Sequence, residues 1–234
     1  MKTGDPGWNK GVMVLGTGTG VGKTVFSAYL IRQLMDSGHS VVPIKPVCSG
    51  GMEDVRILCD AARNRFTPDQ VNPWRYDLPI TPMLAARRSG RPLTSRSLVA
   101  SLENRLKLAE HPVVESAGGP LSPIAEDYNN LDLAVELKMS CVLVALNRLG
   151  VISEVLLVLS ELKRRSLECR GVILNTPVVG DESVDSNAEM IREFAHGTRV
   201  EMLPWLGENP CSEMLFGVNE KKVKKGVELV GLID

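Results

Sequence analysis

Residues 11–36 contain the feature that most constrains the fold of this chain. The apolar run GVMVLG (11–16) leads into GTGTGVGKT (16–24), and a segment with helical periodicity follows. Glycines permit positive φ angles, with which successive backbone N–H groups can turn toward one anion, and the following helix adds the positive end of its dipole. A strand, a glycine-rich loop and a helix in this order predict a phosphate-binding loop.

Two side chains of this loop indicate which phosphate compound it binds. Lys23 would lie along the β- and γ-phosphates of a nucleotide, and the Thr24 hydroxyl would be a ligand of the Mg²⁺ that accompanies ATP. A glycine-rich helix cap with a solvated lysine is the alternative, and the order of the three elements argues against it. The loop is a variant type, because five residues separate Gly16 from Gly22 where the common motif has four.

Apolar runs rich in β-branched residues alternate with segments of helical periodicity along the chain. The apolar runs predict strands at residues 11–16, 40–45, 112–116, 141–146, 170–175 and 199–204. The segments between them predict helices at residues 23–36, 53–63, 95–109, 130–138, 150–165 and 185–196. We therefore expect an α/β fold of the P-loop NTPase type, with a mostly parallel sheet, helices on both faces and a single domain over residues 1–234.

Residues 64–94 are the expected excursion from this alternation, because they contain five prolines. Such a segment could cover a site at the sheet edge.

The overall composition limits the classes of protein to consider. Lys and Arg (27) nearly balance Asp and Glu (28), so the net charge of −1 gives no reason to expect nucleic acid or an anionic membrane as partner. The five cysteines are scattered, and the three histidines lie far apart, which favours reduced thiols over disulfides or a zinc site. The polar start and the short apolar run after it fit neither a signal peptide nor a membrane span, so we expect a cytoplasmic protein.

Charged residues lie at the ends of the second and third predicted strands, where ligands bind in parallel sheets. Lys45 ends the second strand, with Asp54 beyond it, and Glu115 ends the third. Carboxylates there suit Mg²⁺, directly or through water, and a lysine would neutralise charge that moves during phosphoryl transfer. Solvated loop charges are the alternative, which has most weight for Asp54.

Six segments resemble dethiobiotin synthetases, in order and between about residue 11 and about residue 212. They are GTGTGVGKT, KPVCSG (45–50), ESAGG (115–119), LNRLGVISEVLL (146–157), VILN (172–175) and PWLGENP (204–210). Many ATPases share the phosphate loop, whereas KPVxSG, AGG and PWLxENP are more specific to this family.

The resemblance implies an ATP-dependent cyclo-ligase of biotin synthesis that converts 7,8-diaminononanoate and CO₂ to dethiobiotin, with release of ADP and phosphate. CO₂ would form a carbamate on one amine, and the carbamate would attack the γ-phosphate to give a carbamic–phosphoric anhydride. The second amine would then displace phosphate and close the ureido ring. The resemblance also implies Mg²⁺ as cofactor, ATP as co-substrate and a homodimer in which the neighbouring subunit completes each site.

Functional residues carry over from this family by matching motif. Lys23 and Lys45 would bind the γ-phosphate and the carbamate and, with Thr19, would be the catalytic residues, while Thr24, Asp54 and Glu115 would hold Mg²⁺. Other residues expected to contact the nucleotide are Gly20, Val21, Gly22, Val25, Ser116, Ala117, Gly118, Asn175, Thr176, Pro204, Trp205 and Leu206. Those expected to bind the diamine or its carbamate are Thr19, Lys45 and Ser49. Gly150 and Ser153, at a predicted helix start, would receive the diamine's distal carboxylate through free backbone N–H groups, and an ordinary buried helix without this role is the alternative.

The chain departs from the family pattern at five positions. Gly18 and Gly20 replace acidic or polar residues, Ser116 replaces a glycine, Met83 replaces a histidine, and Cys211 replaces an acidic residue. Changes near the γ-phosphate and the ribose affect the expected nucleotide selectivity more than the expected reaction. The Cβ atom of Ser116 would restrict a turn that glycine makes freely.

Two other classes of protein share the ATP-binding half. A partition or septum-positioning ATPase would carry a second lysine early in the loop, where this chain has Thr17, and residues 219–234 lack the apolar anchors of a membrane-targeting helix. The amidating synthetases of cobyrinate metabolism append a glutamine-hydrolysing domain, for which this chain has no room.

Overall fold

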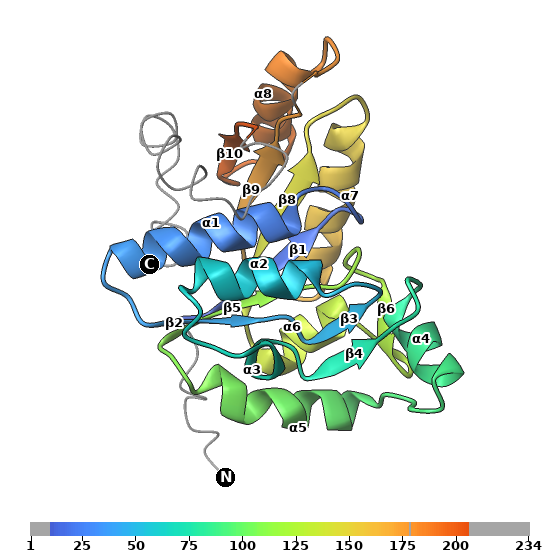
Figure 1. Ribbon diagram of the computed structural model, residues 1–234. Helices are drawn as coiled ribbons and strands as arrows, with labels where there is room; N and C mark the ends of the chain where they lie inside the picture. The colour runs from blue at the N-terminus through green and yellow to red at the C-terminus, as the bar shows by residue number, and fades with distance from the viewer. Residues whose placement is uncertain (1–9, 178, 206–234) are drawn as a thin grey trace.

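The computed structural model describes residues 10–177 and 179–205, which form a central six-stranded sheet with helices on both faces (Figure 1). The strands of this sheet are β1 (Val12–Gly16), β2 (Val41–Ile44), β5 (His111–Glu115), β8 (Ser140–Leu146), β9 (Cys169–Asn175) and β10 (Val200–Leu203). Two small sheets pair β3 (Val47–Ser49) with β4 (Trp74–Tyr76) and β6 (Pro123–Ala125) with β7 (Tyr128–Asn129). The helices are α1 (Lys23–Asp36), α2 (Glu53–Ala61), α3 (Pro68–Val71), α4 (Pro82–Arg88), α5 (Ser95–Leu106), α6 (Asn130–Leu137), α7 (Val151–Arg164) and α8 (Val184–Phe194).

All pairs of neighbouring strands in the central sheet are parallel, in the order β10-β9-β8-β1-β5-β2. From β1 the chain first crosses to β2 on one side, and later builds β8, β9 and β10 on the other side. Because all strands run in the same direction, the loops that follow them gather at one edge of the sheet. Ligands of such folds bind at this edge, near the point where the strand order reverses.

The hydrophobic core has two layers, one on each face of the sheet (Figure 1). Strand β1 shows the reason, because successive side chains of a strand point to opposite faces. Val12 and Val14 pack in the cluster that includes Phe26 of α1, whereas Met13 and Leu15 pack in the cluster that includes helices α5 to α8. Both faces of the sheet are therefore buried, as expected for a parallel sheet.

The structure confirms the predicted fold class, a single α/β domain with a parallel sheet. All six predicted strands and all six predicted helices are present, with ends that differ by a few residues. Within residues 64–94 the chain forms α3, β4 and α4, and the pairing of β3 with β4 was not expected. The extension of one domain over residues 1–234 reaches beyond the described part of the chain and stays a prediction.

Among the helices described, none combines the length and apolar character needed to cross a membrane.

Candidate active site

The phosphate loop joins β1 to α1 and has the backbone geometry of an anion site. Gly20 and Gly22 have φ angles of 75° and 94°, in the left-handed region that glycine adopts without strain. A Cβ atom on Gly22 would also lie 2.0 Å from Nδ2 of Asn175, so both the φ angle and the close approach require glycine. No side chain caps the N-terminus of α1, which leaves its first backbone N–H groups available to a phosphate.

Lys23 is folded back along its own loop. Its buried ammonium group donates a hydrogen bond to the carbonyl oxygen of Gly18 at 2.7 Å. Burial, together with the nearby charge of Lys45, lowers the pKa of Lys23 to about 8. The group is therefore poised beside the glycine-rich turn, where the phosphates of a nucleotide would offer it a stronger acceptor.

Four side chains from different elements meet beside this loop. Nζ of Lys45, which follows β2, donates to Oε1 of Glu115 at 2.5 Å and to Oδ2 of Asp54 at 2.8 Å. The Thr24 hydroxyl lies 2.8 Å from the same Glu115 oxygen and 3.0 Å from Oδ1 of Asp54, and its one proton can be donated to only one of them at a time. The structure thus brings together the four residues that the sequence singled out as the phosphate and metal ligands.

These charges shift one another's protonation equilibria. Burial lowers the pKa of the Lys45 amine, but the charges of Glu115 and Asp54 outweigh it and hold this pKa above its usual value. Burial raises the pKa of the Asp54 carboxyl, but the charge of Lys45 and hydrogen bonds from Lys45 and Thr24 bring it below its usual value. Lys45 and Asp54 are therefore an ion pair at neutral pH.

Two buried asparagines that the sequence did not single out hold the backbone around this cluster. The Asn72 side chain donates to the carbonyl oxygen of Lys45 at 2.6 Å. The Asn130 side chain donates to the carbonyl oxygens of Ala117 and Gly119, both at 2.8 Å, and so fixes the turn after Glu115. Neither residue lies in a recognisable motif, and only the folded chain brings them to these carbonyls.

A cavity of about 410 Å³ opens beside the cluster. Thr19, Lys45, Ser49, Asp54 and Gly118, all predicted site residues, contribute to its wall. Residues 79–82, from the proline-rich excursion, form another part of the wall, so the prediction that this excursion covers a site agrees with its place beside the cavity. Gly150 and Ser153 do not line this cavity; they lie at the exposed start of α7, at the end of β8.

Known proteins are similar to this chain in sequence. A family model described as an AAA domain matches residues 10–210. The ATP-dependent dethiobiotin synthetase BioD of Akkermansia muciniphila is 33% identical over 199 residues, which cover 84% of this chain and 90% of the relative. Its namesakes in Anaeromyxobacter dehalogenans (34%, covering 84% and 90%) and Methanocaldococcus jannaschii (33%, covering 70% and 78%) are similarly close. The chain belongs to the dethiobiotin synthetase family.

Membership of this family confirms the resemblance found in the sequence and the expectation of an ATP-dependent ligase. It does not favour the partition or septum-positioning class. The solved structure of apo McdA from Cyanthece covers 95% of both chains with a TM-score of 0.51 at 12% identity, which shows a shared fold alone.

The residues that the dethiobiotin synthetase resemblance predicts to bind the base lie at the ends of β9 and β10. The Asn175 amide donates to the carbonyl oxygen of Val21 at 3.3 Å, so it touches the phosphate loop directly. Thr176 donates its backbone N–H to Leu203, which brings the two strand ends together. Pro204 and the partly exposed Trp205 follow, and Leu206 lies outside the described residues.

The departures from the dethiobiotin synthetase pattern that lie within the described residues introduce no strained φ angle at a non-glycine residue. Gly20 faces open space, since a Cβ atom there would have no neighbour within 4 Å. The expectation that Ser116 restricts its turn is wrong, because its φ angle is not in the left-handed region; its buried hydroxyl has no hydrogen-bond partner in the structure. Met83 is half-buried at the start of α4, and Cys211 lies outside the described residues.

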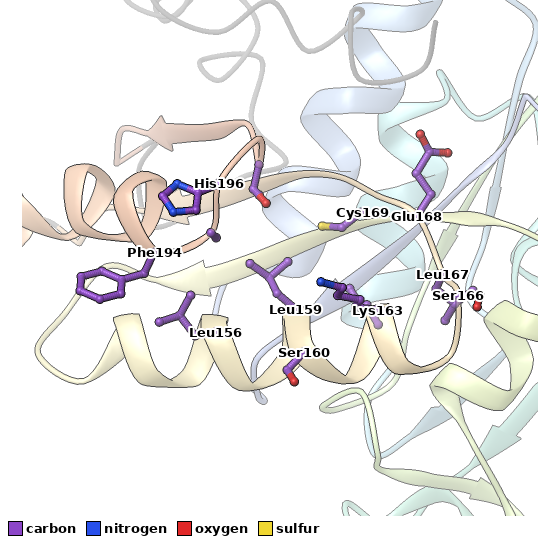
Figure 2. Close-up of a pocket in the computed structure, with 13 residues that line it drawn as sticks. Leu156, Leu159, Ser160, Lys163, Ser166, Leu167, Glu168, Cys169, Phe194 and His196 are labelled. Carbon is purple, nitrogen blue, oxygen red and sulfur yellow. The ribbon is translucent and has the colours of Figure 1, made fainter.

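A separate cavity of about 860 Å³ lies between α7 and α8, where β9 begins (Figure 2). Its wall includes the apolar side chains of Leu156, Leu159 and Phe194; His196 lies beside Phe194, and Cys169 lies at the start of β9. None of the predicted dethiobiotin synthetase site residues lines it, and it lies toward the edge of the sheet opposite the phosphate loop. The predicted site residues line the smaller cavity beside Lys45, which is therefore the candidate active site.

Proposed function

We propose that this protein makes dethiobiotin from 7,8-diaminononanoate, CO₂ and ATP, releasing ADP and phosphate. The observation that carries the proposal is the contact of Thr24 of the phosphate loop with Asp54 and Glu115, which both bind Lys45, beside a cavity that Lys45 and Asp54 line. Membership of the dethiobiotin synthetase family supports the identity of the substrates.

The nucleotide's phosphates would bind against the glycine-rich loop and the N-terminus of α1. Backbone N–H groups of residues 20–25 would contact the phosphates, and Lys23 would exchange the Gly18 carbonyl for a γ-phosphate oxygen. Residues 116–118, which follow Glu115, would line the other side of the γ-phosphate. Gly20 faces open space, which supports the proposal that a nucleotide can reach this loop directly.

The residues present fit a magnesium ion. Glu115 is fully buried, yet its Oε2 atom has no hydrogen-bond partner, and a buried carboxylate oxygen without a partner is unfavourable unless it binds a ligand. Asp54 and the Thr24 hydroxyl add the hard oxygen ligands that Mg²⁺ prefers, and nucleotide phosphates and water would complete its shell. Bound with ATP, Mg²⁺ would neutralise phosphate charge and orient the γ-phosphate.

The cavity beside Lys45 would hold the diamine. CO₂ adds to one amine, which loses a proton to give a carbamate, and a carbamate oxygen attacks the γ-phosphorus as ADP leaves. The second amine then attacks the carbonyl carbon and loses a proton, and phosphate departs as the ring closes. Thr19, Ser49 and Gly118 would orient the diamine and its carbamate, while Lys23 and Lys45 offset the repulsion between carbamate and γ-phosphate.

The adenine and ribose would lie at the ends of β9 and β10. Asn175 has both donor and acceptor atoms for the adenine edge, with Thr176 beside it. Pro204, Trp205 and Leu206 would pack against the base and ribose. The exposure of Trp205, unusual for so large a side chain, supports this role.

The active protein would be a cytoplasmic homodimer in which α7 of one subunit completes the site of the other. Gly150 and Ser153 would receive the carboxylate of the diamine bound by the neighbour, which agrees with their distance from the Lys45 cavity of their own chain. Leu121 and Leu157 support an interface, because they are 57% and 69% exposed and share an apolar cavity of about 420 Å³.

Product analysis tests the function. Purified protein is incubated with ATP, Mg²⁺, bicarbonate and 7,8-diaminononanoate, and dethiobiotin is measured by mass spectrometry beside phosphate release. We expect equal amounts of dethiobiotin and phosphate, and neither when the diamine is omitted. Phosphate release that does not respond to the diamine would refute the proposed function.

The variant Lys45→Gln sharpens this test. It should lose on the order of a hundredfold in diamine-dependent turnover, as expected when one preorganised charge is removed from a transition state, while it keeps most of its affinity for ATP. Lys163→Gln is the matched control, because Lys163 is an exposed lysine on α7 beside the other cavity. It should react like the unmutated protein. Normal turnover by Lys45→Gln would show that Lys45 has no role in the reaction.

A further inference from the structure

The Lys45 ammonium group occupies the centre of the proposed metal site. It lies 2.5 Å from Oε1 of Glu115 and 2.8 Å from Oδ2 of Asp54, while the Thr24 hydroxyl contacts the same two carboxylates from another side. These three residues are the ones proposed to hold Mg²⁺. One cation, the lysine's own, is therefore already bound by both carboxylates that would hold a metal ion, although Oε2 of Glu115 has no partner.

We infer that Lys45 is the internal counter-ion of the metal ligands, and that Mg²⁺ and the Lys45 ammonium group compete for the same two carboxylate groups. Binding of the metal would release Lys45 from Glu115 and Asp54, and only then would Lys45 be free to meet an anionic acceptor. The inference rests on the proposed function in naming Mg²⁺ as the ion.

Burial explains why the ligands need a counter-ion. Glu115 is fully buried and Lys45 is 4% exposed, and a buried carboxylate without a countercharge is strongly unfavourable. Asp54 and Glu115 would also repel each other if Lys45 did not lie between them. The ammonium group therefore keeps the two carboxylates together, but it occupies Oε1 of Glu115 and Oδ2 of Asp54.

The surroundings of Lys45 allow its ammonium group to move while its backbone stays in place. Its backbone N–H donates to the carbonyl oxygen of Val71 at 2.9 Å, and its carbonyl oxygen accepts from Asn72 at 2.6 Å. Its side chain is a flexible four-carbon stem that borders the cavity of about 410 Å³. This cavity is the space open to the ammonium group once the carboxylates bind metal, and it is where the diamine would bind.

The competition predicts an unusual gain of metal affinity when a positive charge is removed. Magnesium chloride is titrated calorimetrically into Lys45→Met and into the unmutated protein, without nucleotide or diamine. An opposite charge in contact with a carboxylate changes the pKa of that carboxylate by about one unit or more, which corresponds to about a tenfold change in an equilibrium constant. Lys45→Met should therefore bind Mg²⁺ at least about tenfold more tightly than the unmutated protein. Equal or weaker binding by Lys45→Met would overturn the inference.

Lys23→Met is the matched control. This variant also removes one lysine charge near Glu115 and Asp54. Lys23, however, donates its hydrogen bond to the Gly18 carbonyl and not to a carboxylate. We expect a clearly smaller gain in Mg²⁺ affinity than for Lys45→Met. An equal gain would show that net charge alone, and not occupation of the ligands, sets the affinity, and would also overturn the inference.

A second measurement uses the unmutated protein and does not depend on whether Lys45→Met folds. Lysine side chains labelled with ¹³C at Cε are followed by NMR during the same titration. The Lys45 signal should shift in step with metal binding, and a Lys45 signal that stays in place at saturating Mg²⁺ would refute the competition. Because neither experiment contains ATP or the diamine, dethiobiotin formation can succeed while this inference fails, and the reverse.

Discussion

Glu115 is the residue on which the proposed metal site most depends, because it combines complete burial with an oxygen atom that has no partner. Glu115→Gln keeps the shape of the side chain and removes its charge. We expect diamine-dependent turnover at limiting Mg²⁺ to fall at least about tenfold, since even indirect partners of metal ligands contribute that much. Asp54→Asn should have a smaller effect, because the Asp54 side chain is 44% exposed and water can replace it.

Turnover of both variants is measured as a function of Mg²⁺ concentration, with circular dichroism as a check on folding. The exposed Glu103→Gln on α5 is the control and should behave like the unmutated protein. Full activity of Glu115→Gln or Asp54→Asn at limiting Mg²⁺ would mean that the residue concerned is not a ligand.

Asn175 is expected to contribute to base choice and also to support the phosphate loop. Asn175→Ala should reduce discrimination between ATP and other nucleoside triphosphates, because the amide would pair with both a donor and an acceptor of adenine in the proposed complex. It should also weaken the binding of all of them, because the contact with Val21 is lost. Competition among ATP, GTP and CTP in the turnover assay measures both effects, with the exposed Asn104→Ala as control. Equal use of the three nucleotides by the unmutated protein would exclude Asn175 as the residue that sets base choice.

Individual residues differed in how far the sequence could identify them. Lys45 and Glu115 were predictable, because they end apolar strands whose carboxyl ends must gather at one edge of a parallel sheet. Their mutual contact was not, since it depends on how β2 and β5 pair around the phosphate loop. Asn72 and Asn130 could not be found at all: both act through side-chain bonds to a backbone segment that is distant in sequence.

The loop after β8 is joined to the start of α8 by a pair of buried asparagines. Asn187 donates to Oδ1 of Asn147 at 2.8 Å and to the hydroxyl of Ser183 at 3.0 Å, while Asn147 donates to the carbonyl oxygen of Val184 at 3.0 Å. The Asn147 backbone N–H also donates to Asn175. These hydrogen bonds therefore fix the loop before α7 relative to the end of β9, where we propose that the base binds.

Removing this pair should weaken the fold. Asn187→Ala leaves buried acceptors without their donor, and we expect the free energy of unfolding to fall by about 1–3 kcal/mol. Urea unfolding measures the change. Glu189→Ala, an exposed substitution on the same helix, should change the free energy of unfolding by less than about 0.5 kcal/mol. A loss for Asn187→Ala no larger than for Glu189→Ala would show that the asparagine pair is not important for stability.

The central strands and the long helices were predictable because each carries a periodic apolar pattern of its own. The small sheets were not. Strands β3 and β4 have three residues each, and each exists because the other lies beside it, with 24 residues of chain between them. A three-residue segment is too short for a period to be recognised, so its structure depends on tertiary contacts.

The assembly of the molecule can be tested on the outward face of α7. Leu157→Glu places a charge in the proposed interface, where burying it without a partner is unfavourable. We expect a monomer by size-exclusion chromatography with light scattering, loss of most diamine-dependent turnover and unchanged affinity for ATP. Leu108→Glu changes another exposed leucine, beyond α5, and should leave the dimer intact. A fully active dimer of Leu157→Glu would place the interface elsewhere.

The two walls of the active-site cavity have separate origins in the chain. The wall that would handle phosphate comes from strand ends and the glycine-rich loop, whereas residues 79–82 come from the excursion between β3 and α5. Evolution can therefore alter one without rebuilding the other. If the proposed function holds, residues 77–82 are therefore a target for directed evolution toward other diamines, because this segment is separate in sequence from the phosphate-binding wall.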